Sequence, residues 1–156
     1  MSLEYRDCLR KGKIRPFSRG KSLAAKQLES ADSDLRRAEA THRDGDFKWA
    51  TIQFYYSMFH AARALIYYRN LREHSHRCLI EAVRTLFVER GLLPNALLEG
   101  FKEAKNLRED ADYYGRWTKS GCEKLIKIGR TEPAAGISAV GSRRGALRMP
   151  SARSRP

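Results

Sequence analysis

The stretch "DFKWATIQFYYSMFHAARALIYYRN", residues 46–70, decides the fold. From Trp49 to Tyr68 its apolar residues fall on nearly every face of a helix, and Asp46 stands before them as an N-cap. A helix that is apolar all round has to be covered on all sides. The segment therefore predicts a central helix, either within one bundle or between two.

Other helical patterns lie on both sides of this segment. Residues 21–43 are amphipathic and mostly polar, and residues 75–91 carry an apolar stripe that ends at a glycine. A further helix is predicted over 95–114, with Gly115 as its stop, and a weaker fifth one over 119–128. We find no strand pattern and no internal repeat. The sequence predicts an all-α fold, an antiparallel four- to five-helix up-and-down bundle.

The net charge of +13 is concentrated at the two ends of the chain. Residues 1–21 carry +5 and residues 131–156 carry +4, which leaves only +4 on the residues between them. Basic tails of this kind bind RNA or DNA loosely and without sequence preference, or serve no specific role. The charge alone therefore does not make the folded part a nucleic-acid-binding domain.

Composition divides the chain into three parts. We expect a basic, partly disordered N-terminal segment over 1–20, a helical bundle over 21–129 and a disordered basic tail over 130–156. The tail is rich in Arg, Ser, Gly, Ala and Pro and has too few large apolar residues to fold. Because the composition changes abruptly, an out-of-frame end to the gene is a further hypothesis.

The cysteines and the N-terminus indicate where the protein resides. Cys8, Cys78 and Cys122 form no C-x-x-C pair and have no zinc-binding spacing, so we expect reduced thiols. The charged N-terminus lacks the apolar region of a signal peptide, and no apolar run approaches the roughly 18 residues of a membrane span. The sequence predicts a soluble, cytoplasmic protein that does not associate with membranes.

Most familiar catalytic motifs are absent from the sequence. There is no glycine-rich phosphate loop, no G-x-S-x-G and no cysteine–histidine nucleophile pattern. Asp44 and Asp46 flank Gly45, but the other ligands of a calcium loop are missing, and a turn followed by an N-cap explains them. We therefore expect neither a metal nor a cofactor.

Charged and titratable side chains on the helices need partners. His60 is expected to be a hydrogen-bonded core residue. Arg63, one turn further on, must pair or reach water, and a neighbouring helix or a second subunit is expected to supply the partner. His74 and His76 flank Ser75 at a predicted helix start, where capping and exposure to solvent are expected.

The stretch "NLREDADYY", residues 106–114, is the candidate site. Its acidic residues oppose the helix macrodipole, at roughly 0.3–1 kcal/mol each. Arg108 and Asp112 lie four residues apart and project from one face. Two interpretations are open. One is an ion pair worth about 0.2–0.5 kcal/mol, and the other is a polar patch of Arg108, Asp112 and Tyr113 that binds a ligand.

At these residues the chain resembles the HEPN domain family of helical nucleotide-binding domains. The resemblance rests on "YYSMFHAARALI" (55–66), "SHRCLIEAVRTLFV" (75–88) and "LREDADY" (107–113), in this order and spacing. It is similar to the small stand-alone prokaryotic branch with an R-x-x-A-D-Y signature. The signature corresponds here to Arg108, Ala111, Asp112 and Tyr113.

The resemblance implies a function as well as a fold. Many HEPN domains are dimeric, metal-independent ribonucleases that act as toxins or defence effectors beside a nucleotidyltransferase antitoxin. Their active site is an R-x(4–6)-H motif in which arginine steadies the phosphate and histidine handles protons. Arg108 matches the arginine, whereas Tyr113 stands where the histidine would fall. In some relatives a tyrosine near the motif is modified with AMP by the partner.

The tyrosine leaves two functions open, because an unperturbed phenol titrates near 10 and is mainly a proton donor. One is an RNA- or nucleotide-binding toxin with endoribonuclease activity, in which Arg108, Asp112 and Tyr113 are the catalytic candidates. The other is a non-catalytic helical module that docks the partner transferase.

Association of two copies is expected from the central helix. Its large side chains cover more of the surface than one thin bundle can bury: Trp49, Tyr55, Tyr56, Met58, Phe59, Ile66 and Tyr67. We therefore expect a C2 homodimer.

Overall fold

The structure, a computed structural model, describes residues 1–131. Its elements, in chain order, are α1 (Leu3–Arg10), β1 (Ile14–Pro16), α2 (Gly20–Arg43), α3 (Phe47–Tyr68), β2 (Leu71–Glu73), α4 (His76–Val83), the π-helical turn η1 (Arg84–Val88), α5 (Asn95–Tyr113) and α6 (Lys119–Thr131). The predicted helical bundle is confirmed, and a small two-stranded sheet is added to it. Within residues 1–131 no helix is both long and apolar enough to cross a membrane.

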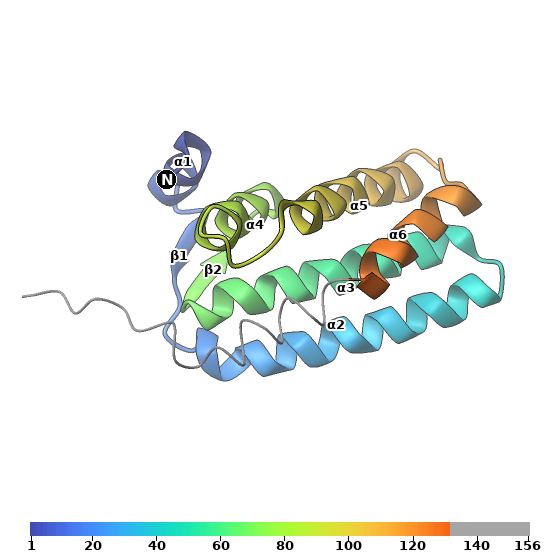
Figure 1. Ribbon diagram of the computed structural model, residues 1–156, viewed down its shortest axis with the longest axis horizontal. Helices are drawn as coiled ribbons and strands as arrows, with labels where there is room; N and C mark the ends of the chain where they lie inside the picture. The colour runs from blue at the N-terminus through green and yellow to red at the C-terminus, as the bar shows by residue number, and fades with distance from the viewer. Residues whose placement is uncertain (132–156) are drawn as a thin grey trace, which may run out of the picture.

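α3 is the central helix, as its sequence predicts. It contacts α2, α4, α5, α6 and β2 (Figure 1). Asp46 caps it, because Oδ1 accepts a hydrogen bond from the backbone N–H of Trp49 at 3.1 Å. Of the seven side chains expected at a dimer interface, five are buried within one chain, while Trp49 is exposed and Tyr56 half-buried. Most of this surface needs no second copy, and the homodimer stays a prediction.

Small residues on α2 let it approach α3 closely. Its buried alanines recur at every seventh position: Ala24, Ala31 and Ala38. The Ser57 hydroxyl on α3 donates to the Ala31 carbonyl at 2.7 Å. At the start of α2, a Cβ added to Gly20 would lie 2.4 Å from the Tyr67 carbonyl oxygen. The spacing of the two longest helices therefore depends on side chains of this size.

The N-terminal segment differs from the partly disordered one expected. It forms α1 and β1 and buries Tyr5, Cys8 and Ile14. β1 pairs antiparallel with β2, and Ile14 lies opposite Glu73. A strand of three residues is too short to show an alternating apolar pattern, which is why the sequence predicts no strand.

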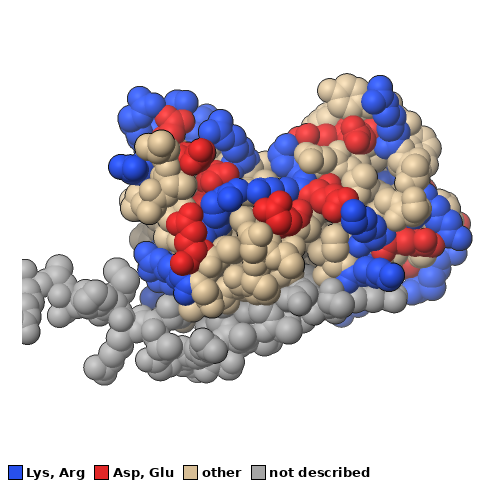
Figure 2. Space-filling model, turned by 45° about the horizontal axis from the view of Figure 1, so that its top comes forward, with Lys and Arg blue, Asp and Glu red and all other residues tan. Residues whose placement is uncertain are grey.

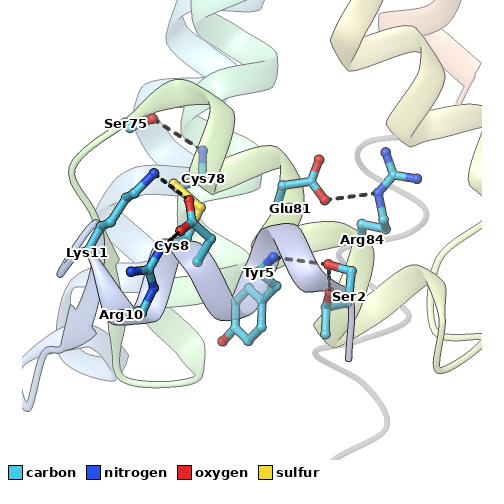
Figure 3. Close-up of a disulfide and its surroundings, with 11 residues drawn as sticks. Ser2, Tyr5, Cys8, Arg10, Lys11, Ser75, Cys78, Glu81 and Arg84 are labelled. Atoms are coloured by element: carbon cyan, nitrogen blue, oxygen red, sulfur yellow. Dashed lines mark hydrogen bonds and ion pairs between the residues drawn. A yellow bond between two sulfur atoms is a disulfide. The ribbon is translucent and has the colours of Figure 1, made fainter.

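A disulfide between Cys8 and Cys78 joins α1 to α4 (Figure 3). The prediction of three reduced thiols is therefore wrong for this pair, whereas Cys122 is free and buried. The two cysteines are 70 positions apart, and only the packing of α1 on α4 brings them together. Because disulfides persist mainly in oxidising compartments, the bond counts against a strongly reducing cytosol. The cytoplasmic location stays a prediction.

The helix predicted over 75–91 consists of two elements. The Ser75 hydroxyl caps α4 by accepting a hydrogen bond from the Cys78 backbone N–H at 3.3 Å. The chain then widens into η1, where the Glu89 N–H reaches the Arg84 carbonyl at 2.9 Å. Apolar periodicity does not distinguish this wider turn from an α-helix, because both keep the same side chains near the core.

The last two helices agree with the sequence. α5 ends just before Gly115, whose φ of 60° is in the left-handed region that favours glycine. α6 buries Cys122, Leu125 and Ile126 against the bundle. The tail predicted over 130–156 lies almost entirely outside the described residues.

Candidate functional site

Arg108 occupies a core position on α5. Apart from Gly100, the buried residues of this helix recur at intervals of three and four: Leu98, Phe101, Ala104, Arg108 and Ala111. Arg108 thus continues the apolar stripe, and only 8% of its surface is exposed. A guanidinium at such a position must find polar partners.

Two phenols and one carboxylate contact this guanidinium. Nη2 of Arg108 donates to the Tyr56 hydroxyl on α3 at 3.1 Å, and Nη1 donates to the Tyr113 hydroxyl at 3.3 Å. Oδ2 of Asp112 lies 3.1 Å from Nη2. Burial alone would lower the pKa of Arg108, but the two phenols and the carboxylate outweigh it and raise the pKa. All three candidate residues lie together, and the simple i,i+4 ion pair is one of their contacts.

Tyr55 and His76 extend this group of residues. Arg108, Tyr56, Asp112, Tyr113, Tyr55 and His76 together form what we call the Arg108 cluster. The Tyr55 ring centroid is 5.6 Å from Cζ of Arg108, and its hydroxyl is 2.6 Å from Nδ1 of His76. Burial raises the pKa of Tyr55 against the opposing effect of Arg108. Burial, followed by Arg108 and Lys105, lowers the pKa of His76. The phenol is therefore the donor and a neutral imidazole the acceptor. The expectation of an exposed, capping His76 is wrong, because the ring is half-buried and Ser75 supplies the cap.

Sequence reasoning missed Tyr55, Tyr56 and His76. Two adjacent tyrosines on an otherwise apolar helix were the available signal, because a buried hydroxyl needs a hydrogen-bond partner. The sequence does not say which residues those partners are. Helix packing decides it, since α3, α4 and α5 each contribute to the cluster.

His60 and Arg63 belong to other networks. Nδ1 of His60 lies 2.8 Å from Oε1 of Gln27, and Nε2 lies 3.6 Å from the Asp34 carboxylate, both on α2. His60 is thus hydrogen-bonded, as expected, but its side chain is half-buried and not part of the core. Nε of Arg63 donates to Oε1 of Glu73 at 2.8 Å. A strand of the same chain, and neither a helix nor a second subunit, supplies that partner.

The Arg108 cluster is rich in hydrogen-bond donors. Because the phenols of Tyr56 and Tyr113 accept from the guanidinium, their own hydroxyl hydrogens remain able to donate. Asp112 supplies the one carboxyl group among these contacts. Among the described residues, no three His, Cys, Asp or Glu side chains are grouped as metal ligands. The arrangement suits an anionic oxygen better than a cation.

Comparison with known protein families finds a match that includes the residues of this site. The HEPN domain family matches residues 24–131, which include the whole Arg108 cluster. The chain belongs to the HEPN domain family. Tyr113 is an exposed side chain at the C-terminal end of α5.

Two proteins of Methanocaldococcus jannaschii are similar to this HEPN chain. One, named "Putative toxin MJ0142", is 28% identical over 88 residues, which cover 56% of this chain and 60% of the relative. The other, named "Putative toxin MJ0605", is 29% identical over 86 residues, which cover 55% of this chain and 64% of the relative. The chain thus spans about three fifths of the length of each relative.

The lowered pKa of His76 predicts how stability depends on pH. Since the folded protein binds the proton less readily than the unfolded chain, this contribution to stability is complete above the unfolded pKa of about 6.5 and declines as the pH falls below it. Melting temperatures measured from pH 7.5 to pH 5 should therefore fall less steeply in His76→Gln than in wild type. His74→Gln, at an exposed neighbouring position, is the control. Equal slopes for His76→Gln and wild type would contradict the assignment.

Proposed function

We propose that this HEPN chain is the toxin-type component of a two-component system and that it binds RNA or a nucleotide through a phosphate at Arg108. The names of the two relatives support the first part. The observation that carries the second is the buried guanidinium, which the phenols of Tyr56 and Tyr113 hold in place and which pairs with the partly exposed carboxylate of Asp112. A homodimer and a nucleotidyltransferase antitoxin belong to the same proposal as expectations from the family.

The contacts of Arg108 support a phosphate ligand. Nε of Arg108 is buried and has no hydrogen-bond partner. The carboxylate of Asp112 is about one third exposed, so it can share the guanidinium with an incoming anion or turn into solvent. A charge-assisted hydrogen bond to an anionic oxygen is worth roughly 1.5–3 kcal/mol.

A broad basic surface does not contribute to this proposal. On the face seen in Figure 2, Lys and Arg side chains are interspersed with Asp and Glu. This face of the folded part would therefore hold RNA by local contacts, and not by a continuous field of positive charge.

Metal-independent RNA cleavage is the finer part of the proposal. It needs a group that takes the 2′-hydroxyl proton, so that this oxygen can attack phosphorus, and a donor that protonates the departing 5′-oxygen. Asp112 is the acceptor in the cluster and Tyr113 the donor, while Arg108 would stabilise the charge on the phosphorus oxygens. His76 does not supply the base, because its Nδ1 accepts from Tyr55 and Nε2 of the neutral ring therefore carries the hydrogen.

A second candidate function is a non-catalytic module that docks a nucleotidyltransferase. The specific observation in its favour is the pair of exposed phenols, Tyr113 and Tyr114, at the C-terminal end of α5. These side chains are accessible to a partner. A docking module would keep partner binding when RNA cleavage is absent.

The test is Arg108→Met, which keeps the side-chain length and removes the charge. It should fold, because Asp112 remains solvated, and it should bind RNA or nucleotide about ten- to a hundredfold more weakly. Tyr113→Phe and Asp112→Asn test the other candidates, and Lys105→Met, one turn earlier on α5, is the matched control. Melting temperature, RNA binding, cleavage and growth inhibition are measured on each. Wild-type binding by Arg108→Met would remove the phosphate role, and a wild-type protein that binds a nucleotidyltransferase but neither binds nor cleaves RNA would favour the docking module.

A further inference from the structure

The exposed aromatic side chains lie together at one end of the bundle. Trp49, Tyr113, Tyr114 and Trp117 are 51%, 66%, 66% and 48% exposed, and they include every large aromatic side chain that is exposed among the described residues. They come from the start of α3, the end of α5 and the connection to α6, which meet at the right-hand end of Figure 1. Four exposed aromatic rings in one region are unusual on a surface without a ligand.

Cations face these rings. Nζ of Lys48 lies 5.6 Å from the ring centroids of both Trp49 and Trp117. Cζ of Arg116 is 5.7 Å from the Tyr114 ring, and Cζ of Arg108 is 5.0 Å from the Tyr113 ring. Alternation of aromatic rings with Lys and Arg is the pattern by which proteins hold single-stranded nucleic acid.

The group continues from the Arg108 cluster. Trp49 precedes Tyr56 by seven residues, so both lie on nearly the same face of α3, about 10 Å apart. Tyr56 bonds Arg108, and Tyr113 belongs to both groups. A strand with one phosphate at Arg108 would therefore have its neighbouring nucleotides beside the aromatic rings.

We propose that Trp49, Tyr113, Tyr114 and Trp117, with Lys48 and Arg116, form a platform on which unpaired bases of single-stranded RNA stack. This rests on the proposed function and specifies its substrate class. Each ring presents a face to which any base can stack, and the cations contact the backbone. Duplex RNA does not fit, because the faces of its bases are already stacked. The cations favour nucleic acid over an apolar protein partner.

The tryptophans provide a direct readout, since Trp49 and Trp117 are the two tryptophans in the chain. A short oligouridylate should quench the tryptophan fluorescence of the full chain, and duplex RNA of equal length should not. An oligodeoxythymidylate, which lacks the 2′-hydroxyl, separates binding from cleavage. Trp49→Ala and Trp117→Ala should each weaken binding about 5- to 150-fold, while Trp49→Phe stays close to wild type.

Controls separate this inference from the proposed function. Leu9→Ala changes an exposed apolar residue on α1 and should bind as wild type does. If Arg108→Met loses binding and both tryptophan variants keep it, the platform is wrong and the phosphate site stands. If the tryptophan variants lose binding and Arg108→Met keeps it, the platform stands and the phosphate site fails. Equal quenching by duplex RNA would overturn the platform. Tryptophan variants that bind RNA normally but have a different mass by light scattering would also overturn the platform. That result would assign the rings to an interface between protein chains.

Discussion

Replacing Arg63 by methionine should lower the free energy of unfolding by about 3–5 kcal/mol. The Glu73 side chain is 3% exposed, and its Oε1 accepts from Nε and Nη2 of Arg63. Oε2 of Glu73 has no partner. Without the guanidinium, a buried carboxylate would have no compensating charge. Chemical denaturation of wild type and variant at pH 7 measures the difference.

Two further variants show whether the loss comes from the buried pair. Arg63→Met combined with Glu73→Leu removes both charges and should recover much of the stability. Arg36→Met breaks an ion pair with Asp32 on the surface, where the two side chains are 71% and 61% exposed. This variant should lower the free energy of unfolding by less than about 1 kcal/mol. A similar small loss in Arg63→Met would mean that Glu73 finds other solvation.

Reduction of the Cys8–Cys78 disulfide should lower the free energy of unfolding by about 4 kcal/mol. The bond closes a loop of 70 residues, and opening it returns that entropy to the unfolded chain. For a domain of this size the melting temperature should fall by about 10–15 °C. Thermal melts with and without dithiothreitol measure the shift.

The thiol count and the double variant provide the controls. Unfolded, non-reduced protein should release one reactive thiol, from Cys122. Cys8→Ser combined with Cys78→Ser should melt at the temperature of the reduced protein and show no response to dithiothreitol. Three reactive thiols in the non-reduced protein would contradict the pairing. After reduction, hydrogen exchange should show a loss of protection first in α1 and β1, because the disulfide links α1 covalently to α4.

Local patterns in the sequence account for the bundle. The unbroken apolar surface of residues 46–70 requires cover on all sides, so a central α3 follows from hydrophobicity alone. Asp46 and Gly115 mark helix ends because capping and positive φ depend on single residue types. Arg108 and Asp112 are brought together by helical periodicity, and therefore the core of the candidate site was predictable.

Contacts between residues distant in the sequence were decided only by the tertiary structure. Cys8 meets Cys78, Arg63 meets Glu73, and Tyr55 meets His76 because particular elements pack side by side. The spacing of these residues in the sequence does not predict the pairs. Each residue needs a hydrogen-bonding partner or a second cysteine, and several residues in the chain could serve as that partner. The sequence by itself determined the helices of the bundle other than α1 and η1, the family resemblance and the Arg108 motif. Packing determined which phenols surround the guanidinium, because α3 and α5 set the distance between Tyr56 and Arg108.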